Sequence, residues 1–284
     1  MKPEIVRKPE VVLLPGARTG RDPARSIKRG PSRLPPDVVA ATQRERLLDG
    51  LVHTVAQHGY QHATVSDICR AAGVTRPVFY ELFTGKEDAF LAAHRHGTGV
   101  VIRRMAAAFA AAPDWCTGIR EALRSMLGLL AGVPAFATMA VIELDAVGPA
   151  GRREREQLLT RFRGFFAEVP QLPGGVAKNA MVDAVVGGVY STLQRCIDAG
   201  RTAQLPDLLP TLSLFCLAPF LGPAEAARRL SAVPAPDPAP ASAPPTDQDP
   251  GADPAQASDP AQADHRRADD DPSCTRIDPP NTGQ

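Results

Sequence analysis

The sequence is poor in aromatic residues and lacks the residue spacing of metal sites and disulfide frameworks. Aromatic residues make up 5% of its 284 residues, and tryptophan occurs once. The five cysteines are scattered, odd in number and without the Cys-x-x-Cys or Cys/His spacing of a zinc site. We therefore expect no metal site, no cofactor and no disulfide framework. A reducing compartment follows, and we predict a cytoplasmic protein.

Long hydrophobic runs are also missing. The N-terminal apolar run, residues 11–14, is too short for the core of a signal peptide. Two uncharged stretches, 125–142 and 208–224, are broken by glycine or proline and barely reach the length of about 20 residues that a membrane span needs. Both stretches are better explained as buried helices of a helical domain, and no membrane association is expected.

The sequence contains none of the common catalytic motifs. There is no GxSxG, no HExxH and no GxxxxGK[ST]. The glycine-containing stretch HGTGVV at 96–101 has no strand before it, so it lacks the geometry of a phosphate-binding loop. We therefore expect that the protein is not an enzyme, and an α-helical enzyme is only a distant alternative.

Charge and proline divide the chain into a folded middle and two tails. Residues 1–33 carry nine Lys/Arg against three acids, and residues 231–284 carry ten Asp against three Arg. Both ends have too few large apolar residues to offset the entropy of ordering. We predict a disordered basic, Pro-rich arm at 1–36 and a disordered acidic tail at 231–284. Whether the arm contacts DNA or is a passive extension stays open at this point.

The folded middle has helical periodicity almost throughout. Leu47, Leu48, Leu51, Val52 and Val55 form one face of a first helix that is predicted to end near Gly59. No segment shows the sustained alternation of a half-buried strand. The fold class is therefore predicted to be all-α.

The stretch TVSDICRAAGVTRPVFYELF contains two helix starts around one glycine. Thr64 precedes a short helix with Asp67 three residues on, and Gly73 supplies the left-handed ending. Thr75 is predicted to cap the next helix, with Pro77 in its first turn. This spacing indicates a helix-turn-helix, although an ordinary pair of antiparallel helices has the same caps.

Residues 44–92 as a whole resemble the TetR family of bacterial one-component transcriptional repressors. The similarity rests on RERLLDGLVHTVAQHGY, the Ala72-Gly73-Val74 turn, the aromatic pair Phe79-Tyr80 and the stretch GKED at 85–88. The resemblance implies a three-helix helix-turn-helix domain at 37–92 and a helical ligand-binding and dimerisation domain at 93–230.

The resemblance also implies which residues meet double-stranded DNA. Recognition-helix residues would enter the major groove, and flanking residues would contact phosphates; the set is Thr64, Thr75, Arg76, Pro77, Val78, Tyr80 and Lys86. DNA-binding domains usually carry a net positive charge, but residues 37–96 contain six Lys/Arg and seven Asp/Glu.

Two further sets of residues are predicted in the C-terminal domain. Large or polarizable residues among small neighbours are candidates to line an apolar ligand pocket: Trp115, Met126, Phe136, Met139 and Glu143. Small and branched residues on the last long helices are candidates for a dimer interface: Val182, Val186, Val189, Tyr190, Leu208, Leu212 and Phe215. For each residue, plain packing within one chain is the alternative.

The sequence therefore predicts a homodimeric, sequence-specific regulator of transcription. We expect a repressor that binds a palindromic operator and is released by a small, largely apolar effector. The alternative is a regulator of the same fold that has no small-molecule effector and acts through a protein partner.

Overall fold

The computed structural model describes residues 13–22, 35–169 and 177–231, and these are helical without any strand. The all-α prediction is confirmed for this part of the chain. The ten α-helices are α1 (Pro36–His62), α2 (Val65–Ala72), α3 (Arg76–Leu82), α4 (Lys86–Ala110), α5 (Trp115–Gly132), α6 (Pro134–Ala137), α7 (Pro149–Arg163), α8 (Lys178–Asp198), α9 (Leu209–Leu221) and α10 (Pro223–Ser231).

The helix-turn-helix unit consists of α1, α2 and α3. The apolar face of α1 is buried as predicted, from Leu47 to Val55. The helix does not stop at Gly59 but kinks there, because Gly59 has φ 75°, and one further turn runs to His62. This backbone conformation is unfavourable for residues with a Cβ, which explains glycine at the kink.

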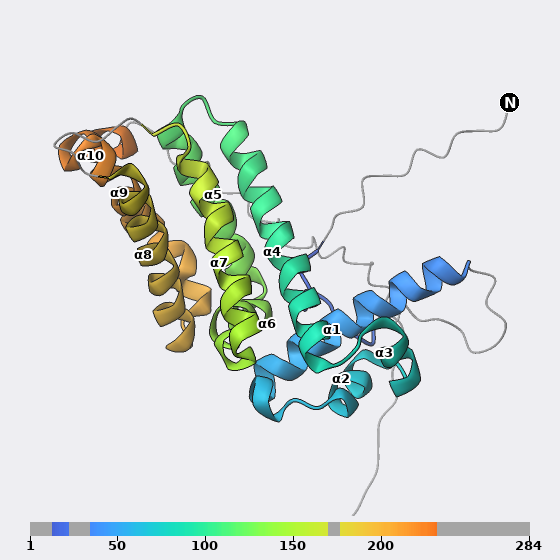
Figure 1. Ribbon diagram of the computed structural model, residues 1–284. Helices are drawn as coiled ribbons and strands as arrows, with labels where there is room; N and C mark the ends of the chain where they lie inside the picture. The colour runs from blue at the N-terminus through green and yellow to red at the C-terminus, as the bar shows by residue number, and fades with distance from the viewer. Residues whose placement is uncertain (1–12, 23–34, 170–176, 232–284) are drawn as a thin grey trace, which may run out of the picture. The chain divides into compact units, whose positions relative to one another are not determined.

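Helix α4 connects this unit to the helical bundle (Figure 1). It begins beside α3 and packs along α5, while α7 and α8 pack against each other farther along the chain. Short helical turns join these elements: η2 (Thr138–Ile142), η3 (Asp145–Val147), η4 (Gly164–Phe166) and η6 (Thr202–Leu208). The predicted boundary between residues 92 and 93 therefore falls inside one continuous helix.

One continuous hydrophobic core extends from α1 into the bundle. A polar cluster of the buried His94 and Glu154 and the exposed Arg95 lies beside it where α4 meets α7. The Nε of Arg95 lies 2.9 Å from Oε2 of Glu154, and Nδ1 of the fully buried His94 lies 3.8 Å from Oε1. His94 and Arg95 hold the pKa of the Glu154 carboxyl below its usual range, although its burial opposes this shift. The cluster fixes the contact between α4 and α7.

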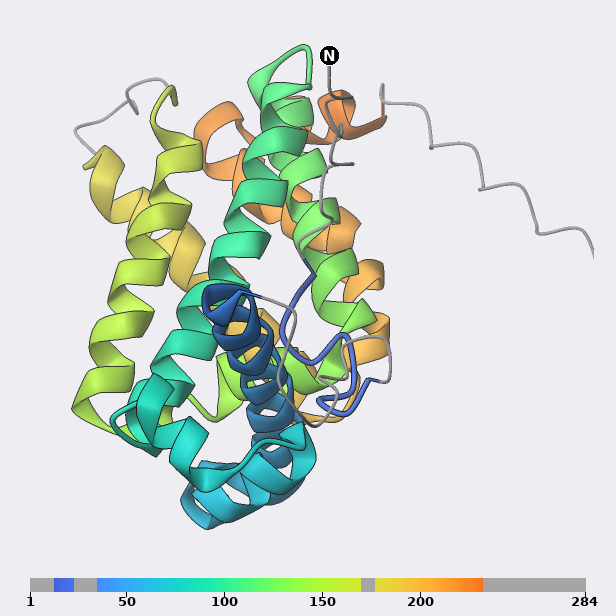
Figure 2. The same ribbon diagram turned by 90° about the vertical axis from the view of Figure 1, so that its right-hand side faces the viewer.

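Part of the predicted disordered arm is ordered, which corrects the expectation for residues 13–22. This stretch, here called the docked segment, lies against α1 (Figure 2), with Leu14 and Gly20 buried. Hydrogen bonds of Gly16, Arg18, Gly20 and Arg21 attach it to α1 and α2. The remaining arm residues, 1–12 and 23–34, and the predicted tail from 232 onward lie outside the described residues.

The bundle includes one helical stretch, Thr202–Leu221, that is long and apolar enough to cross a membrane by length and composition. The pair Trp115–Gly132 and Pro134–Ile142 also passes this test when taken together, but it bends by 106° at the break. Only 28% of the tested window of Thr202–Leu221 is buried within the chain. The rest of that window is half-buried or exposed.

Candidate functional site

The start of α2 and the turn after it have the geometry that the sequence predicts. The Thr64 hydroxyl oxygen accepts the N–H of Asp67 at 3.2 Å and donates to the Asp67 carboxylate at 2.6 Å. These hydrogen bonds, led by the one from Thr64, lower the pKa of Asp67. Gly73 ends the helix at φ 63° in the left-handed region. The exposed Thr64 therefore serves first as the cap of α2.

Helix α3 presents a short exposed surface at its N-terminus. Thr75, Arg76 and Pro77 are exposed, Val78 is half-buried, and Tyr80 is 52% exposed. Phe79 turns inward and is fully buried, with its ring 5.3 Å from that of Tyr80. Thr75 occupies the N-cap position without a side-chain capping bond, so the predicted cap by its hydroxyl is not made. Its hydroxyl is instead presented on the exposed surface.

Lys86 has a different place from the one that the resemblance implies. Its ammonium donates to the carbonyl oxygens of Tyr60 at 2.7 Å and Ala63 at 3.0 Å, and lies 4.4 Å from the centre of the Tyr60 ring. Partial burial lowers the pKa of this ammonium. These contacts lie at the end of α1, where several carbonyls have no partner in the helix. Lys86 thus stabilises the end of α1. Its contact with a DNA phosphate stays a prediction.

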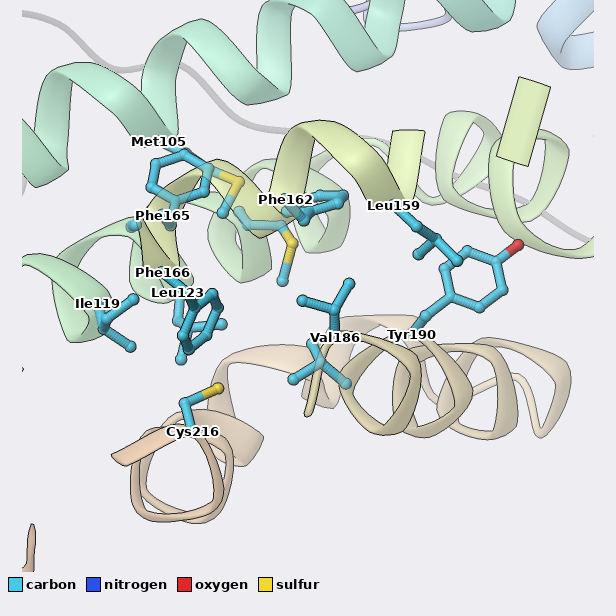
Figure 3. Close-up of a pocket in the computed structure, with 13 residues that line it drawn as sticks. Met105, Ile119, Leu123, Leu159, Phe162, Phe165, Phe166, Val186, Tyr190 and Cys216 are labelled. Atoms are coloured by element: carbon cyan, nitrogen blue, oxygen red, sulfur yellow. The ribbon is translucent and has the colours of Figure 1, made fainter. Parts of the chain in front are cut away.

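A second candidate site is a cavity of about 50 Å³ inside the bundle. Figure 3 shows its lining converging from α4, α5, α7, α8 and α9. The lining residues are Met105, Ile119, Ala122, Leu123, Met126, Leu159, Phe162, Phe165, Phe166, Val186, Val189, Tyr190 and Cys216. Tyr190 supplies the phenol at one end, which donates to the carbonyl of Val141 at 3.2 Å. Burial raises the pKa of this phenol.

Of the five predicted ligand residues, only Met126 lines this cavity. Trp115 instead donates its indole N–H to the carbonyl of Phe165 at 2.9 Å, behind the cavity wall. Phe136 is fully buried against Gly97 of α4, where a Cβ would lie 2.1 Å from the ring. Met139 is fully buried elsewhere in the core. The structure places these three residues outside this cavity, in contacts that large residues also make as ordinary core packing. Their role as ligand contacts stays a prediction.

Glu143, another predicted ligand residue, lies at the end of α1 and outside the cavity. Its carboxylate accepts the backbone N–H of Tyr60 at 2.7 Å, directly after the kink at Gly59. Next to it, the side-chain amide of Gln61 donates to the carbonyl of Ala146 at 2.9 Å. Glu143 therefore ties the end of α1 to the bundle and does not orient a guest in the cavity.

Sequence reasoning missed most of the true lining. The phenylalanines of α7 and its extension, Phe162, Phe165 and Phe166, point into the cavity together with Leu159. The available signal was the spacing of these aromatic residues at one end of an otherwise charged helix. That spacing identifies an inward face but not the cavity that it encloses.

The predicted dimer residues divide into two groups. Phe215 is 42% exposed and Leu208 is half-buried. The other five face the inside of the chain: Val182, Val186 and Leu212 are buried, and Val189 and Tyr190 line the cavity. Four of these five lie on the inward face of α8, and Leu212 lies on that of α9, so they pack within the chain. Their place in a dimer interface stays a prediction.

Comparison with known proteins agrees with the sequence resemblance. The family model for bacterial regulatory proteins of the tetR family matches residues 47–93. The fatty acid degradation regulator FadR from Bacillus halodurans is 18% identical, with a TM-score of 0.53 over 66% of this chain and 95% of that chain. The regulator FadR from Bacillus subtilis, solved in complex with stearoyl-CoA, is 19% identical, with a TM-score of 0.54 over 62% of this chain and 97% of that chain. Among curated proteins, none matches this chain.

The position of Lys86 leads to a prediction about stability. Lys86→Met should lower the free energy of unfolding by about 1 to 3 kcal/mol, because partly buried carbonyls at the end of α1 lose their donor. Urea unfolding followed by circular dichroism measures this change. Arg76→Ala, which removes an exposed cation, is the control and should stay within about 0.5 kcal/mol of the parent. If Lys86→Met leaves the stability unchanged and weakens the salt dependence of DNA binding, Lys86 contacts a DNA phosphate and does not stabilise the end of α1.

Proposed function

We propose that this chain, a DNA-binding transcriptional regulator whose residues 47–93 form a helix-turn-helix domain of the tetR family, acts as a homodimeric repressor. In this proposal a small, largely apolar molecule releases it from a palindromic operator. The observation that carries the proposal is the exposed N-terminal surface of α3, held on a rigid support by the buried Phe79.

The chemistry of that surface suits the major groove. Arg76 carries the planar donor fork that pairs with guanine, and the half-buried Val78 offers methyl groups to a thymine methyl. Tyr80 and the hydroxyl of Thr75 are available to donate to phosphates, which position the domain without reading bases. The hydroxyl of Thr64 would have to leave the Asp67 carboxylate before it could donate to a phosphate. Pro77 contributes shape at the start of the helix. In this proposal Arg76 and Val78 contact the bases, and the hydroxyl groups contact phosphates and so position the domain on the DNA.

The dimer is proposed to form through the outer faces of α8 and α9. Leu214 and Phe215 on α9 are 39% and 42% exposed, an unusual exposure for large apolar side chains that adjoin one another. The ring of Phe215 lies across Gly188 of α8, where a Cβ would come within 2.7 Å of it. Around Gly187 of the same helix, a Cβ would meet nothing within 4 Å. Two such faces related by a twofold axis would form a four-helix interface.

The effector is proposed to enter the cavity in the bundle. Its lining is apolar apart from the Tyr190 phenol, which favours a neutral, apolar guest or the apolar part of a larger one. At about 50 Å³ the cavity is far smaller than the roughly 300 Å³ of a typical ligand pocket, so a guest has to displace side chains. Flexible Met105 and Met126 in the lining make such a displacement less costly.

Helix α4 connects the two proposed sites. Met105 lines the cavity, and Lys86 lies 19 residues earlier at the end of α1. At a rise of 1.5 Å per residue this distance is about 29 Å along a single helix. A guest that shifts Met105 would move α4 as a rod, and with it the unit that carries α3. Release of DNA then follows if the two recognition helices of a dimer no longer match successive major grooves.

The DNA proposal predicts a specific loss for Arg76→Ala. Binding to the selected operator should weaken by about 1 to 3 kcal/mol, and the base preference should relax at one symmetric position, because the fork to guanine is lost. DNA selection followed by titration of the selected site measures both effects. Arg161→Ala, which removes an exposed arginine from α7, is the matched control and should leave both unchanged. A uniform loss on all DNA sequences would show that Arg76 does not read a base.

The dimer proposal predicts that Phe215→Glu produces monomers. A carboxylate at this position would have to be desolvated in the interface, which is unfavourable without a partner charge. Sedimentation velocity should show half the parent mass at micromolar concentration. Ala107→Glu, which places the same charge on the exposed side of α4, should remain dimeric. A dimeric Phe215→Glu variant would move the interface away from α9.

The ligand proposal predicts that Ala122→Leu removes the response to an effector. The larger side chain would fill the cavity, while operator affinity without ligand should be retained. Stearoyl-CoA and free stearate are the first probes, and operator affinity with and without each is the measurement. Ala107→Leu on the exposed side of α4 is the control. Equal ligand responses of Ala122→Leu and the parent would place the effector site outside this cavity.

A further inference from the structure

The docked segment (residues 13–22) is attached at both of its ends. At one end Leu14 is 4% exposed and belongs to the continuous core, and the N–H of Gly16 donates to the buried carboxylate of Asp49 at 2.7 Å. In the middle, a ring nitrogen of His53 lies 3.0 Å from the carbonyl of Arg18. At the other end, the carbonyl of Gly20 accepts from Nε of Arg46 at 2.9 Å. Residues 13–22 are thus packed against the folded domain and hydrogen-bonded to it.

Two glycines make this close approach possible. Gly16 has φ +83°, and a Cβ there would lie 2.5 Å from Val52 of α1. Gly20 has no room either, since a Cβ would lie 2.8 Å from the carbonyl oxygen of Ala71 and from the Cα of Ala72. Backbone atoms cannot give way as a flexible side chain can, so a larger residue at position 20 would have to lift the segment from α2. The exposed Ala17 between them has no such constraint.

The C-terminal end of the docked segment contacts α1 and α2 at the turn of the helix-turn-helix. Arg46 of α1 donates to the carbonyls of Gly20 and of Ala72 through Nε, and to that of Gly73 through Nη2 at 3.0 Å. Arg21 of the segment donates to the carbonyl of Arg70 at 2.9 Å. The carbonyls of Arg70, Ala72 and Gly73 lie at the end of α2, where partners within a helix become scarce, although that of Arg70 also accepts the N–H of Gly73. Since α3 begins three residues after Gly73, the hydrogen bonds of Arg46 and Arg21 help to fix the position of the first residue of α3.

The N-terminal end of the docked segment reaches the bundle. A Cβ on Gly16 would lie 3.7 Å from Cγ1 of Val133, which is the junction between α5 and α6. Figure 2 shows the segment between α1 and the green helix α5. The docked segment therefore spans from the corner of α5 and α6 to the turn before α3. It does so on a route separate from α4 and from the Glu143 contact at the far end of α1.

We propose that the docked segment is a brace that fixes the orientation of the helix-turn-helix unit on the bundle. In a dimer this orientation sets the distance between the two recognition helices, and hence the operator spacing that the protein accepts. The inference rests on the proposed function for its effect on DNA, but the brace itself is a property of the free protein. A brace transmits a constraint between its two ends, whereas a passive extension contributes only local contacts.

The test breaks the brace at either end in the full-length protein. Gly20→Val lifts the end at α2, and Leu14→Asp lifts the end in the core. Ala17→Val and Ala17→Asp are the matched controls at the exposed position between them. Hydrogen exchange of the free protein is measured at the turn, residues 73–75, and at the α5–α6 corner, residues 131–135.

Each break should speed exchange at both places by about fivefold or more, because the two ends are linked, while both controls match the parent. Exchange that changes only next to the substituted residue would overturn the brace. In the second arm, the affinity ratio between the selected palindrome and the same site lengthened by one base pair is measured. The ratio should fall by about fivefold or more in both break variants, and an unchanged ratio would overturn the effect on spacing. Failure of the parent to select any palindrome would count against the proposed function alone, since the exchange experiment uses no DNA.

Discussion

The end of α1 is held by two opposite charges, and the rest of the structure depends on this arrangement. After the kink at Gly59, the backbone N–H of Tyr60 donates to the carboxylate of Glu143, and its carbonyl accepts from the ammonium of Lys86. One peptide segment is thus fixed between a residue of the bundle and the first residue of α4. Helix α2 begins only a few residues later, so the position of the whole helix-turn-helix unit follows from this junction.

The other connections act on the same unit from different directions. Helix α4 runs from Lys86 to the cavity lined by Met105, and the docked segment extends from the end of α2 toward the corner near Val133. A rigid body held at three separated places has little freedom to tilt unless one of the contacts gives way. The bundle and the DNA-binding unit also share a continuous core, which couples their packing.

The small size of the cavity has a mechanical consequence for the proposed regulation. A large pocket that is equally well formed in both states of a protein accepts a guest without changing its surroundings, and such binding shifts no equilibrium between the states. A cavity of about 50 Å³ cannot, so a guest is accommodated only if the helices or side chains around it move. The cost of that movement reduces affinity, but it also supplies the differential interaction that a switch requires.

The sequence by itself determined the elements whose cause is local. The helix-turn-helix is predictable because Thr64, Asp67 and Gly73 act through hydrogen bonds and backbone angles within a few residues. The exposed start of α3 follows from the same spacing. Whether Phe136 lines a cavity or packs on Gly97, and whether Glu143 meets a ligand or the N–H of Tyr60, depends on residues 39 and 83 positions away. Helical periodicity identifies an inward face but not what that face meets. The docked segment shows the same limit: its composition is that of a disordered tail, and the contacts that order it come from α1 and α2.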